Sequence, residues 1–175
     1  MTNSVVDVLE LKHLRMRYAS SSSWILEDLN LRVVSGDRLA LVGPSGSGKS
    51  TIARVALQLL PAGSYCEGQV FINGQDPRKV NSNKLRRLRG EEIGLVFQDP
   101  MTRLNPLMSV GEHLIDTLRA HYPGRDFQYY RNRSKDLLLK VGISPSRFNA
   151  YPHEFSGGMR QRVIIALAIA LNPAL

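Results

Sequence analysis

The chain has 175 residues, with 23 Lys and Arg against 15 Asp and Glu, so its formal net charge is +8. A hydrophobic content of 43% is typical of a globular domain, and a lone cysteine, Cys66, excludes an internal disulfide and a multi-cysteine metal site. The longest apolar run, over residues 163–171, is far shorter than the roughly 20 residues that a membrane span needs, which excludes a transmembrane helix.

Alternating β-branched and aliphatic residues predict antiparallel strands over residues 5–11 and 29–34, the second closed by a turn at 35–37. A continuous apolar run over residues 39–42 precedes a glycine-rich loop, as is typical of a strand buried on both faces of a parallel sheet. A helix over residues 49–60 is expected next, and the Pro-Ala-Gly stretch that follows residue 60 marks its end.

Further along the chain, apolar runs over residues 69–72 and 93–97 predict two more strands. Helical spacing of apolar residues over 106–146 predicts a helical subdomain, with the Arg- and Tyr-rich stretch 127–135 on its surface. A last helix is expected over residues 157–171, and the proline shortly after residue 171 prevents its continuation.

The first motif that carries chemistry follows the apolar run at 39–42. It matches the pattern G-x-x-x-x-G-K-[ST] and consists of Gly43, Pro44, Ser45, Gly46, Ser47, Gly48, Lys49 and Ser50. Glycines let backbone N–H groups turn inward around phosphates, and the helix that follows adds the positive end of its dipole. We expect Lys49 to reach the β- and γ-phosphates of ATP, Ser50 to ligate Mg²⁺, and Thr51 to extend the helix start.

A glycine-serine linker that contains Lys-Ser by chance is the competing interpretation, and the predicted strand and helix on either side disfavour it.

Many protein classes carry a phosphate-binding loop, so a second motif has to distinguish between these classes. That motif is Phe155-Ser156-Gly157-Gly158-Met159-Arg160-Gln161-Arg162. At the start of an apolar helix, the hydroxyl of Ser156 and the free amides of Gly157 and Gly158 predict a second anion site. Taken alone, these residues are more typical of an ordinary serine N-cap.

Together the two motifs resemble the ATP-binding-cassette (ABC) family, whose members pair a P-loop with a signature of the form [LF]-S-G-G-x-x-[QR]-R. The resemblance implies an α/β fold: a RecA-like P-loop NTPase core with an N-terminal antiparallel β-subdomain and an inserted helical subdomain. Gln98 matches the glutamine of the Q-loop, which in this family contacts the metal and the attacking water. Tyr18 matches the aromatic residue that stacks on adenine, although an isolated tyrosine is as often a packing residue.

Two longer segments resemble the peptide and nickel importer branch of this family. Residues 97–106, FQDPMTRLNP, are similar to its F-Q-D-P-x-x-x-L-N-P segment, and residues 151–162, YPHEFSGGMRQR, to its Y-P-H-x-F-S-G-G-M-x-Q-R segment. The resemblance implies an ATP-binding subunit that dimerises head to tail, so that Ser156, Gly157 and Gly158 contact the ATP of the partner. It also implies transmembrane permease subunits as partners, and a cytoplasmic chain that is peripheral on the inner face of the membrane.

The predicted organisation is one partial ABC ATPase domain. Residues 1–98 would form the β-subdomain and P-loop core, 99–155 the mainly helical subdomain, and 156–175 the signature helix. After that helix the family carries an apolar strand ending in Asp-Glu and then a switch histidine, whereas every acidic residue here lies at or before Glu154. We therefore expect a domain cut before its catalytic carboxylates, an ATPase by family whose own chain lacks the general-base glutamate. Without that strand, the isolated chain is expected to be marginally stable.

Three alternatives stay open at this point. A small P-loop kinase or GTPase fits the length, but the only candidate guanine motif, residues 83–86, has Arg where Asp is required. A nucleotide-binding fragment without hydrolysis is the second. Nucleic-acid binding by the basic run 78–89 is the third, but a run without aromatic residues is more typical of a solvated face, so no nucleic-acid partner is expected.

His153 is expected to be a loop histidine rather than a metal ligand, since no cysteine or second histidine lies near it.

Overall fold

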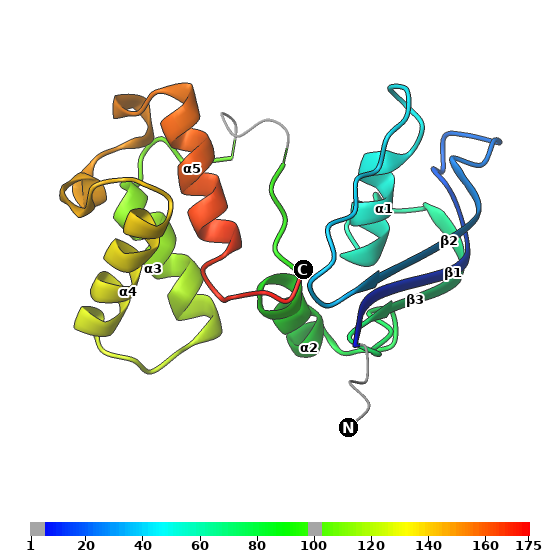
Figure 1. The fold of residues 1–175 in the computed structure, drawn as a ribbon, viewed down its shortest axis with the longest axis horizontal. Helices are drawn as coiled ribbons and strands as arrows, with labels where there is room; N and C mark the ends of the chain where they lie inside the picture. Colours follow the sequence, from blue (N-terminus) through cyan, green and yellow to red (C-terminus); the bar gives the residue numbers. More distant parts are fainter. Residues whose placement is uncertain (1–5, 98–102) are drawn as a thin grey trace. The chain divides into compact units, whose positions relative to one another are not determined.

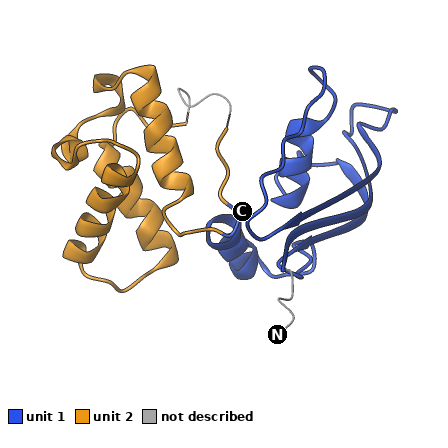
Figure 2. Cartoon of the chain, in the orientation of Figure 1, with its two compact units in different colours: residues 1–93, 174–175 blue, residues 94–173 orange. Residues whose placement is uncertain are grey.

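The structure is a computed structural model that describes residues 6–97 and 103–175. The predicted Q-loop residue, Gln98, lies outside the described residues. The chain divides into two compact units (Figure 2): unit 1 comprises residues 1–93 and 174–175, and unit 2 comprises residues 94–173.

Unit 1 is built on an antiparallel sheet with the strand order β2-β1-β3 (Figure 1). The strands are β1 (Asp7–Arg17), β2 (Leu26–Val34) and β3 (Tyr65–Ile72). The sheet therefore contains the antiparallel strands that the sequence predicts, although β1 and β2 extend further than the apolar alternation indicates.

A β-bulge in the central strand sets which side chains face the core. Leu11 and Leu14 are both buried although three positions separate them, because the register with β3 shifts by one residue around His13. Gly68 of β3 lies opposite the bulge, where a Cβ atom would be 2.4 Å from the carbonyl oxygen of His13. Glycine at this position allows the two backbones to approach.

The helices of unit 1 are α1 (Lys49–Ala56), which lies against β3, and α2 (Ser82–Arg87), which continues into a π-helical turn (Leu88–Glu92). Helix α1 starts at the predicted residue but ends before residue 60. Its early end follows from Gln58, whose backbone is left-handed with a φ of 53° and so cannot continue a right-handed helix.

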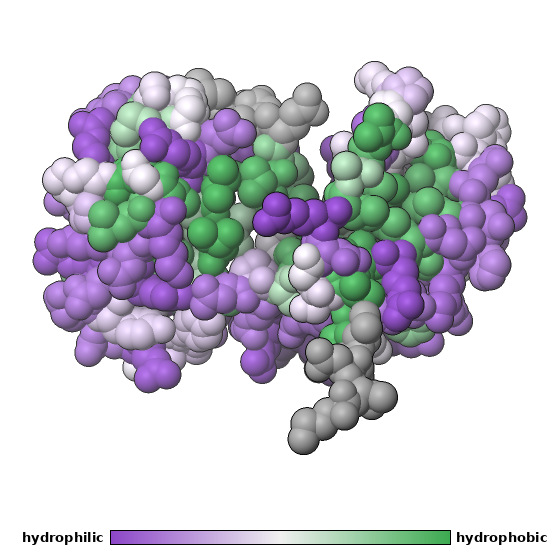
Figure 3. Space-filling model, in the orientation of Figure 1, coloured by the Kyte–Doolittle hydropathy of each residue, from purple (hydrophilic) through white to green (hydrophobic). Residues whose placement is uncertain are grey.

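Two of the predicted strands are not formed. Of the predicted strands 39–42 and 93–97, only Ile93 makes a bridge, an isolated one with Arg89, and residues 39–42 and 94–97 have no strand structure. Leu39, Val42 and Val96 are 53%, 93% and 41% exposed. In the view of Figure 3, apolar surface is exposed on both units. The prediction that both segments are buried strands was wrong for this structure, because a central strand needs hydrogen-bonded neighbours and no strand among the described residues pairs with either segment.

Unit 2 is helical, as the sequence predicts. It contains α3 (Val110–His121), α4 (Phe127–Lys140), two 3₁₀ turns (Pro145–Asn149 and Pro152–Glu154) and α5 (Gly157–Ala168). Helix α5 ends at residue 168, short of the predicted residue 171, and residues 169–171 continue as turns. No helix in the described part of the chain is long and apolar enough to cross a membrane.

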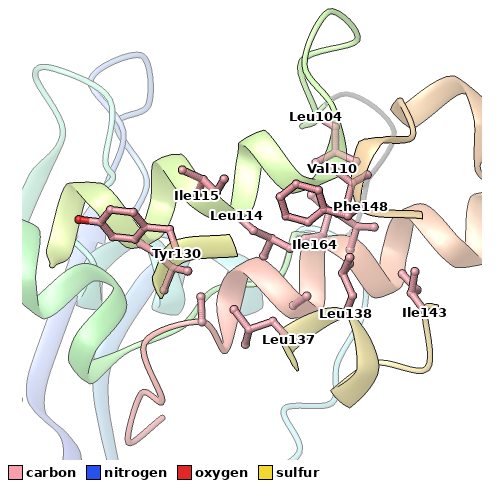
Figure 4. Packing of buried hydrophobic residues seen from close by; sticks show 14 of the residues in the cluster. Leu104, Val110, Leu114, Ile115, Tyr130, Leu137, Leu138, Ile143, Phe148 and Ile164 are labelled. Carbon is pink, nitrogen blue, oxygen red and sulfur yellow. The ribbon is translucent and has the colours of Figure 1, made fainter. Parts of the chain in front are cut away.

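One hydrophobic cluster joins the three long helices of unit 2 (Figure 4). Leu114 of α3, Leu137 and Leu138 of α4, and Val163 of α5 are completely buried in it. Burying one such side chain contributes about 1.5–3 kcal/mol relative to leaving it exposed. The cluster is therefore the main support for the start of α5, where the predicted signature lies.

The start of α3 is closed by a capping box. The carboxylate of Glu112 accepts a hydrogen bond from the backbone N–H of Ser109 at 2.6 Å, and the hydroxyl of Ser109 accepts one from the N–H of Glu112 at 3.2 Å. These bonds lower the pKa of Glu112, chiefly through the backbone N–H. Helix α4 starts similarly, with Asp126 accepting from the N–H of Tyr129 at 2.6 Å.

Substituting Gly111 tests the packing of unit 2. A methyl group at this α3 position would lie 2.5 Å from the ring of Phe148, which is held in the cluster. Gly111→Ala is therefore expected to lower the free energy of unfolding by about 1–3 kcal/mol, although alanine normally favours a helix. Gly158, also the second residue of its helix, has open space around it, so Gly158→Ala is the matched control and should stabilise by up to about 1 kcal/mol. Urea unfolding monitored by circular dichroism measures both, and equal stabilisation would contradict the packing.

Candidate functional site

The predicted phosphate loop lies at the surface of unit 1 and leads directly into α1. Gly48 is the N-cap of α1, with a left-handed φ of 87° and a ψ of 2°. A Cβ atom at Gly48 would lie 2.8 Å from Cδ2 of Leu26 and 3.2 Å from the carbonyl oxygen of Ile25. Glycine is required here both for its backbone angle and for its close contact with the start of β2.

The ammonium group of Lys49 lies across this loop. It donates hydrogen bonds to the carbonyl oxygens of Gly43 at 2.8 Å and Pro44 at 2.6 Å, and to Oγ of Ser47 at 3.3 Å. The first turn of α1 contains no acidic residue, and within the described residues no carboxylate forms an ion pair with Lys49. A positive charge and the positive end of a helix thus meet at the loop, which is an arrangement that suits a phosphate group.

Two hydroxyl side chains begin α1. Ser50 is exposed beside the loop, whereas Thr51 is only 6% exposed. A serine oxygen at the edge of a phosphate site fits Mg²⁺, which prefers oxygen ligands, retains several waters and is commonly held by one or two protein groups plus phosphate. The donor set of the loop is therefore compatible with a magnesium-bound nucleotide.

Tyr18 follows the last residue of β1, and the fold brings it to α1. Its phenol oxygen lies 3.2 Å from Oγ1 of Thr51, and Nη1 of Arg54 donates to it at 3.5 Å. The pKa of Tyr18 is lowered, chiefly by the hydrogen bond with Thr51 and further by Arg54, against partial burial, which raises it. Sequence reasoning named Tyr18 and Thr51 but missed Arg54, although a spacing of three residues places Thr51 and Arg54 on one face of α1.

The predicted signature lies at the start of α5 in unit 2. Phe155 is 3% exposed and is part of the hydrophobic cluster. The hydroxyl of Ser156 caps the helix by accepting from the N–H of Met159 at 3.4 Å. Ser156, Gly157 and Gly158 are exposed, and a Cβ atom at either glycine would have open space around it. One buried side chain thus anchors a short segment whose polar groups face outward.

Asn105, in the described segment before α3, is held to that helix by a histidine. The backbone N–H of Asn105 donates to Nε2 of His113 at 2.9 Å, and Nδ1 of His113 lies 2.8 Å from the carbonyl oxygen of Ser109. Both contacts are satisfied by the neutral imidazole with its proton on Nδ1. Sequence reasoning missed His113, although its spacing of four residues from the N-cap serine places it where it can reach that carbonyl.

His153 lies in the 3₁₀ turn Pro152–Glu154, as expected for a loop histidine. Its ring stacks on that of Tyr151, with centroids 5.8 Å apart and planes inclined by 14°. In the described chain, no group of three or more His, Cys, Asp or Glu side chains is arranged to hold a metal ion.

The basic run 78–89 is tied into unit 1 by several of its arginines. Arg78 forms an ion pair with Asp76 at 3.0 Å, and Arg87 forms one with Glu91 at 3.0 Å. Arg89 is directed inward, where it donates to the backbone carbonyl oxygens of residues 57 and 58 at 2.7 and 2.6 Å. Arg78 and Arg87 stay exposed despite these partners, as expected for a solvated face, whereas Arg89 is partly buried and holds the end of α1 to the run.

The ABC transporter family model matches residues 26–175 of the chain. The oligopeptide transport ATP-binding protein OppD of Bacillus subtilis is 39% identical over 177 aligned residues, which cover 98% of this chain and 49% of OppD. The probable D,D-dipeptide transport ATP-binding protein DdpD of Escherichia coli is 39% identical over 179 residues, which cover 100% of this chain and 54% of DdpD. The chain therefore spans about half the length of the curated relatives it matches.

Solved structures agree with this assignment. A dimeric ATP-binding cassette, MJ0796 bound to ADP and phosphate, superimposes with a TM-score of 0.80 at 30% identity, covering 94% of this chain and 70% of that one. The glycine-rich loop and its helix define a P-loop protein of the α/β class. The chain belongs to the ABC transporter family, and its fold is that of the family's ATPase cassettes.

The shape of the phosphate loop is tested by two glycine substitutions. Gly46 and Gly48 both have left-handed backbones, with φ of 83° and 87°, but only Gly48 is packed against its neighbours. Gly46→Ala is expected to lower the free energy of unfolding by about 1–2 kcal/mol through its backbone angle alone. Gly48→Ala adds the clash with β2 and should cost roughly 1–3 kcal/mol more. Equal losses in urea unfolding would mean that the contact at Gly48 does not constrain the loop.

Proposed function

We propose that this chain is the nucleotide-binding part of an ATP-binding subunit of an ABC importer. The observation that carries the proposal is the phosphate loop, whose only positive side chain, Lys49, lies across it without an acidic partner among the described residues. Relatives named for oligopeptide and D,D-dipeptide transport support peptides as the cargo. Nickel, the other cargo that the sequence resemblance implies, is the alternative.

At the phosphate site, the backbone N–H groups of the glycine-rich loop, which Pro44 alone among residues 43–48 lacks, cradle the phosphates, and Lys49 contacts the β- and γ-oxygens. Ser50 would hold Mg²⁺, which when bound neutralises the charge that develops on the transferred phosphoryl group. Thr51 completes the helix start that faces the phosphates. Tyr18 offers a ring for the adenine, and Gln98 is assigned the contact with the metal and the attacking water.

The proposal extends to a second ATPase subunit. Ser156, Gly157 and Gly158 are assigned the phosphates of an ATP molecule held by that partner, a role supported by their exposure at the start of α5 and by the absence of acid in its first turn. Transmembrane permease subunits are the remaining partners, and they would hold this subunit on the inner face of the membrane. Hydrolysis then couples to transport through this assembly.

Hydrolysis also needs a general base, and the sequence offers no acidic residue after Glu154 to supply one. Loss of a positioned base commonly lowers a rate by about 10²–10⁴-fold. The 175-residue chain is therefore assigned nucleotide binding with little turnover of its own.

Lys49→Ala tests the proposal directly. Removing the ammonium group deletes charge-assisted hydrogen bonds to phosphate, so the affinity for MgATP is expected to fall roughly tenfold or more. Isothermal titration calorimetry measures the affinity, and phosphate release measures turnover, which should be near background in both proteins. Lys140→Ala, which removes an exposed lysine at the end of α4, is the matched control and should bind like the unaltered chain.

Two results would contradict this assignment. Equal MgATP affinity in Lys49→Ala and the unaltered chain would remove the phosphate site from the loop. Rapid ATP hydrolysis by the purified chain would show that a general base is present among its own residues.

A further inference from the structure

Tyr18 is held in place by side chains of a helix that is distant from it in the sequence. Its phenol oxygen is within hydrogen-bond distance of Thr51 and of Arg54, at 3.2 and 3.5 Å. Thr51 is buried in the first turn of α1, and Arg54 is exposed in the next turn on the same face. Helix α1 therefore holds the phenol oxygen of Tyr18, whereas the backbone of Tyr18 belongs to the segment after β1.

Arg54 has no competing electrostatic partner in the described chain. No carboxylate there forms an ion pair with it, and its side-chain hydrogen bond is the one to Tyr18. Both residues line an open pocket of about 450 Å³, together with Pro61, Ala62 and the two residues after Tyr18. An exposed arginine directed at a neutral phenol, without a carboxylate to hold it, suggests a role that depends on the phenol.

We propose that Arg54, acting with Thr51, is a positioning residue that fixes the ring of Tyr18 for stacking on the nucleotide base. The inference rests on the proposed function, because it assumes that nucleotide occupies the phosphate loop. Its physical basis is that α1 would then position two subsites at once: the phosphates at its N-terminus and the base platform one turn further on. A ring ordered before binding does not have to be immobilised when the base arrives, which favours affinity.

The inference makes a base-specific prediction. Magnesium tripolyphosphate contains the phosphates of MgATP without base or ribose, so it reports on the loop alone. Arg54→Met removes the guanidinium group and keeps a long apolar side chain. It should lower the affinity for MgATP about fivefold, the usual effect of one lost hydrogen bond, and leave tripolyphosphate within about twofold. Arg54→Lys, which keeps a cation and a donor, should recover part of the loss.

A double-mutant cycle tests whether Arg54 acts through the phenol oxygen. Tyr18→Phe keeps the aromatic ring and removes that oxygen, so it should also weaken MgATP. Once the oxygen is gone, adding Arg54→Met should produce no further loss. The matched control is Arg119→Met, since the guanidinium carbon of Arg119 also lies near a tyrosine, 5.7 Å from the ring centroid of Tyr130, but in unit 2. It should leave both affinities unchanged.

An independent readout is the titration of Tyr18. Its pKa is lowered by the hydrogen bond with Thr51 and by the hydrogen bond and charge of Arg54. Arg54→Met should therefore raise the pKa of Tyr18 toward its ordinary value, which ¹³C NMR of labelled tyrosine resolves. A helix residue that only stabilised the fold would not move this value.

Several results would overturn the inference. Additive losses in the cycle, equal losses for MgATP and tripolyphosphate, or an unchanged affinity in Arg54→Met would each show that Arg54 does not act through Tyr18. The proposed function fails in a different way, with neither MgATP nor tripolyphosphate bound by the unaltered chain, and the inference then fails with it. Binding of both probes with no base-dependent difference between them would retain the phosphate site and reject the base platform.

Discussion

The contact between Gly48 and the start of β2 is the constraint on which the candidate site depends. Because Gly48 has no side chain, the backbone can pass close to Leu26 and turn with a φ of 87° directly into α1. This turn places the ammonium group of Lys49 over the loop and fixes the rotation of α1 about its axis. The same rotation brings Thr51 and Arg54 to face Tyr18. A displaced helix start would therefore disturb the proposed phosphate and base subsites together.

The signature has a separate support within unit 2. Phe155 is buried in the hydrophobic cluster, and the serine after it begins α5, so the segment is held by packing on one side and by a helix cap on the other. A histidine of α3 holds Asn105 in a similar way, through its two ring nitrogens, one of which contacts Asn105 and the other the backbone of Ser109. In both places a motif with little structure of its own is attached to a rigid helix, which is how exposed functional segments keep a defined geometry.

How far the sequence predicted the structure depends on the range of the interactions involved. The phosphate loop, the start of α1 and the serine cap of α5 were predictable, because neighbouring residues determine them. The strands predicted over 39–42 and 93–97 do not form, since apolar sequence does not specify a hydrogen-bonded neighbour strand and the described chain provides none. The approach of Tyr18 to Arg54 depends on how β1 and α1 pack, although the spacing along α1 was readable in advance.

The acidic residues distinguish the helix starts from one another. Helix α3 begins with Glu112 in its capping box and α4 with Asp126 as its N-cap, so a carboxylate of the chain already occupies the positive end of each. Helices α1 and α5 begin with Gly48 and Ser156, and neither has an acid in its first turn. These two are also the helix starts that match family motifs. Helix α2, only six residues long, also starts without an acid. Among the described helices of eight residues or more, the two whose starts are assigned to phosphate are those left without an internal anion, which a surplus of +8 alone would not indicate.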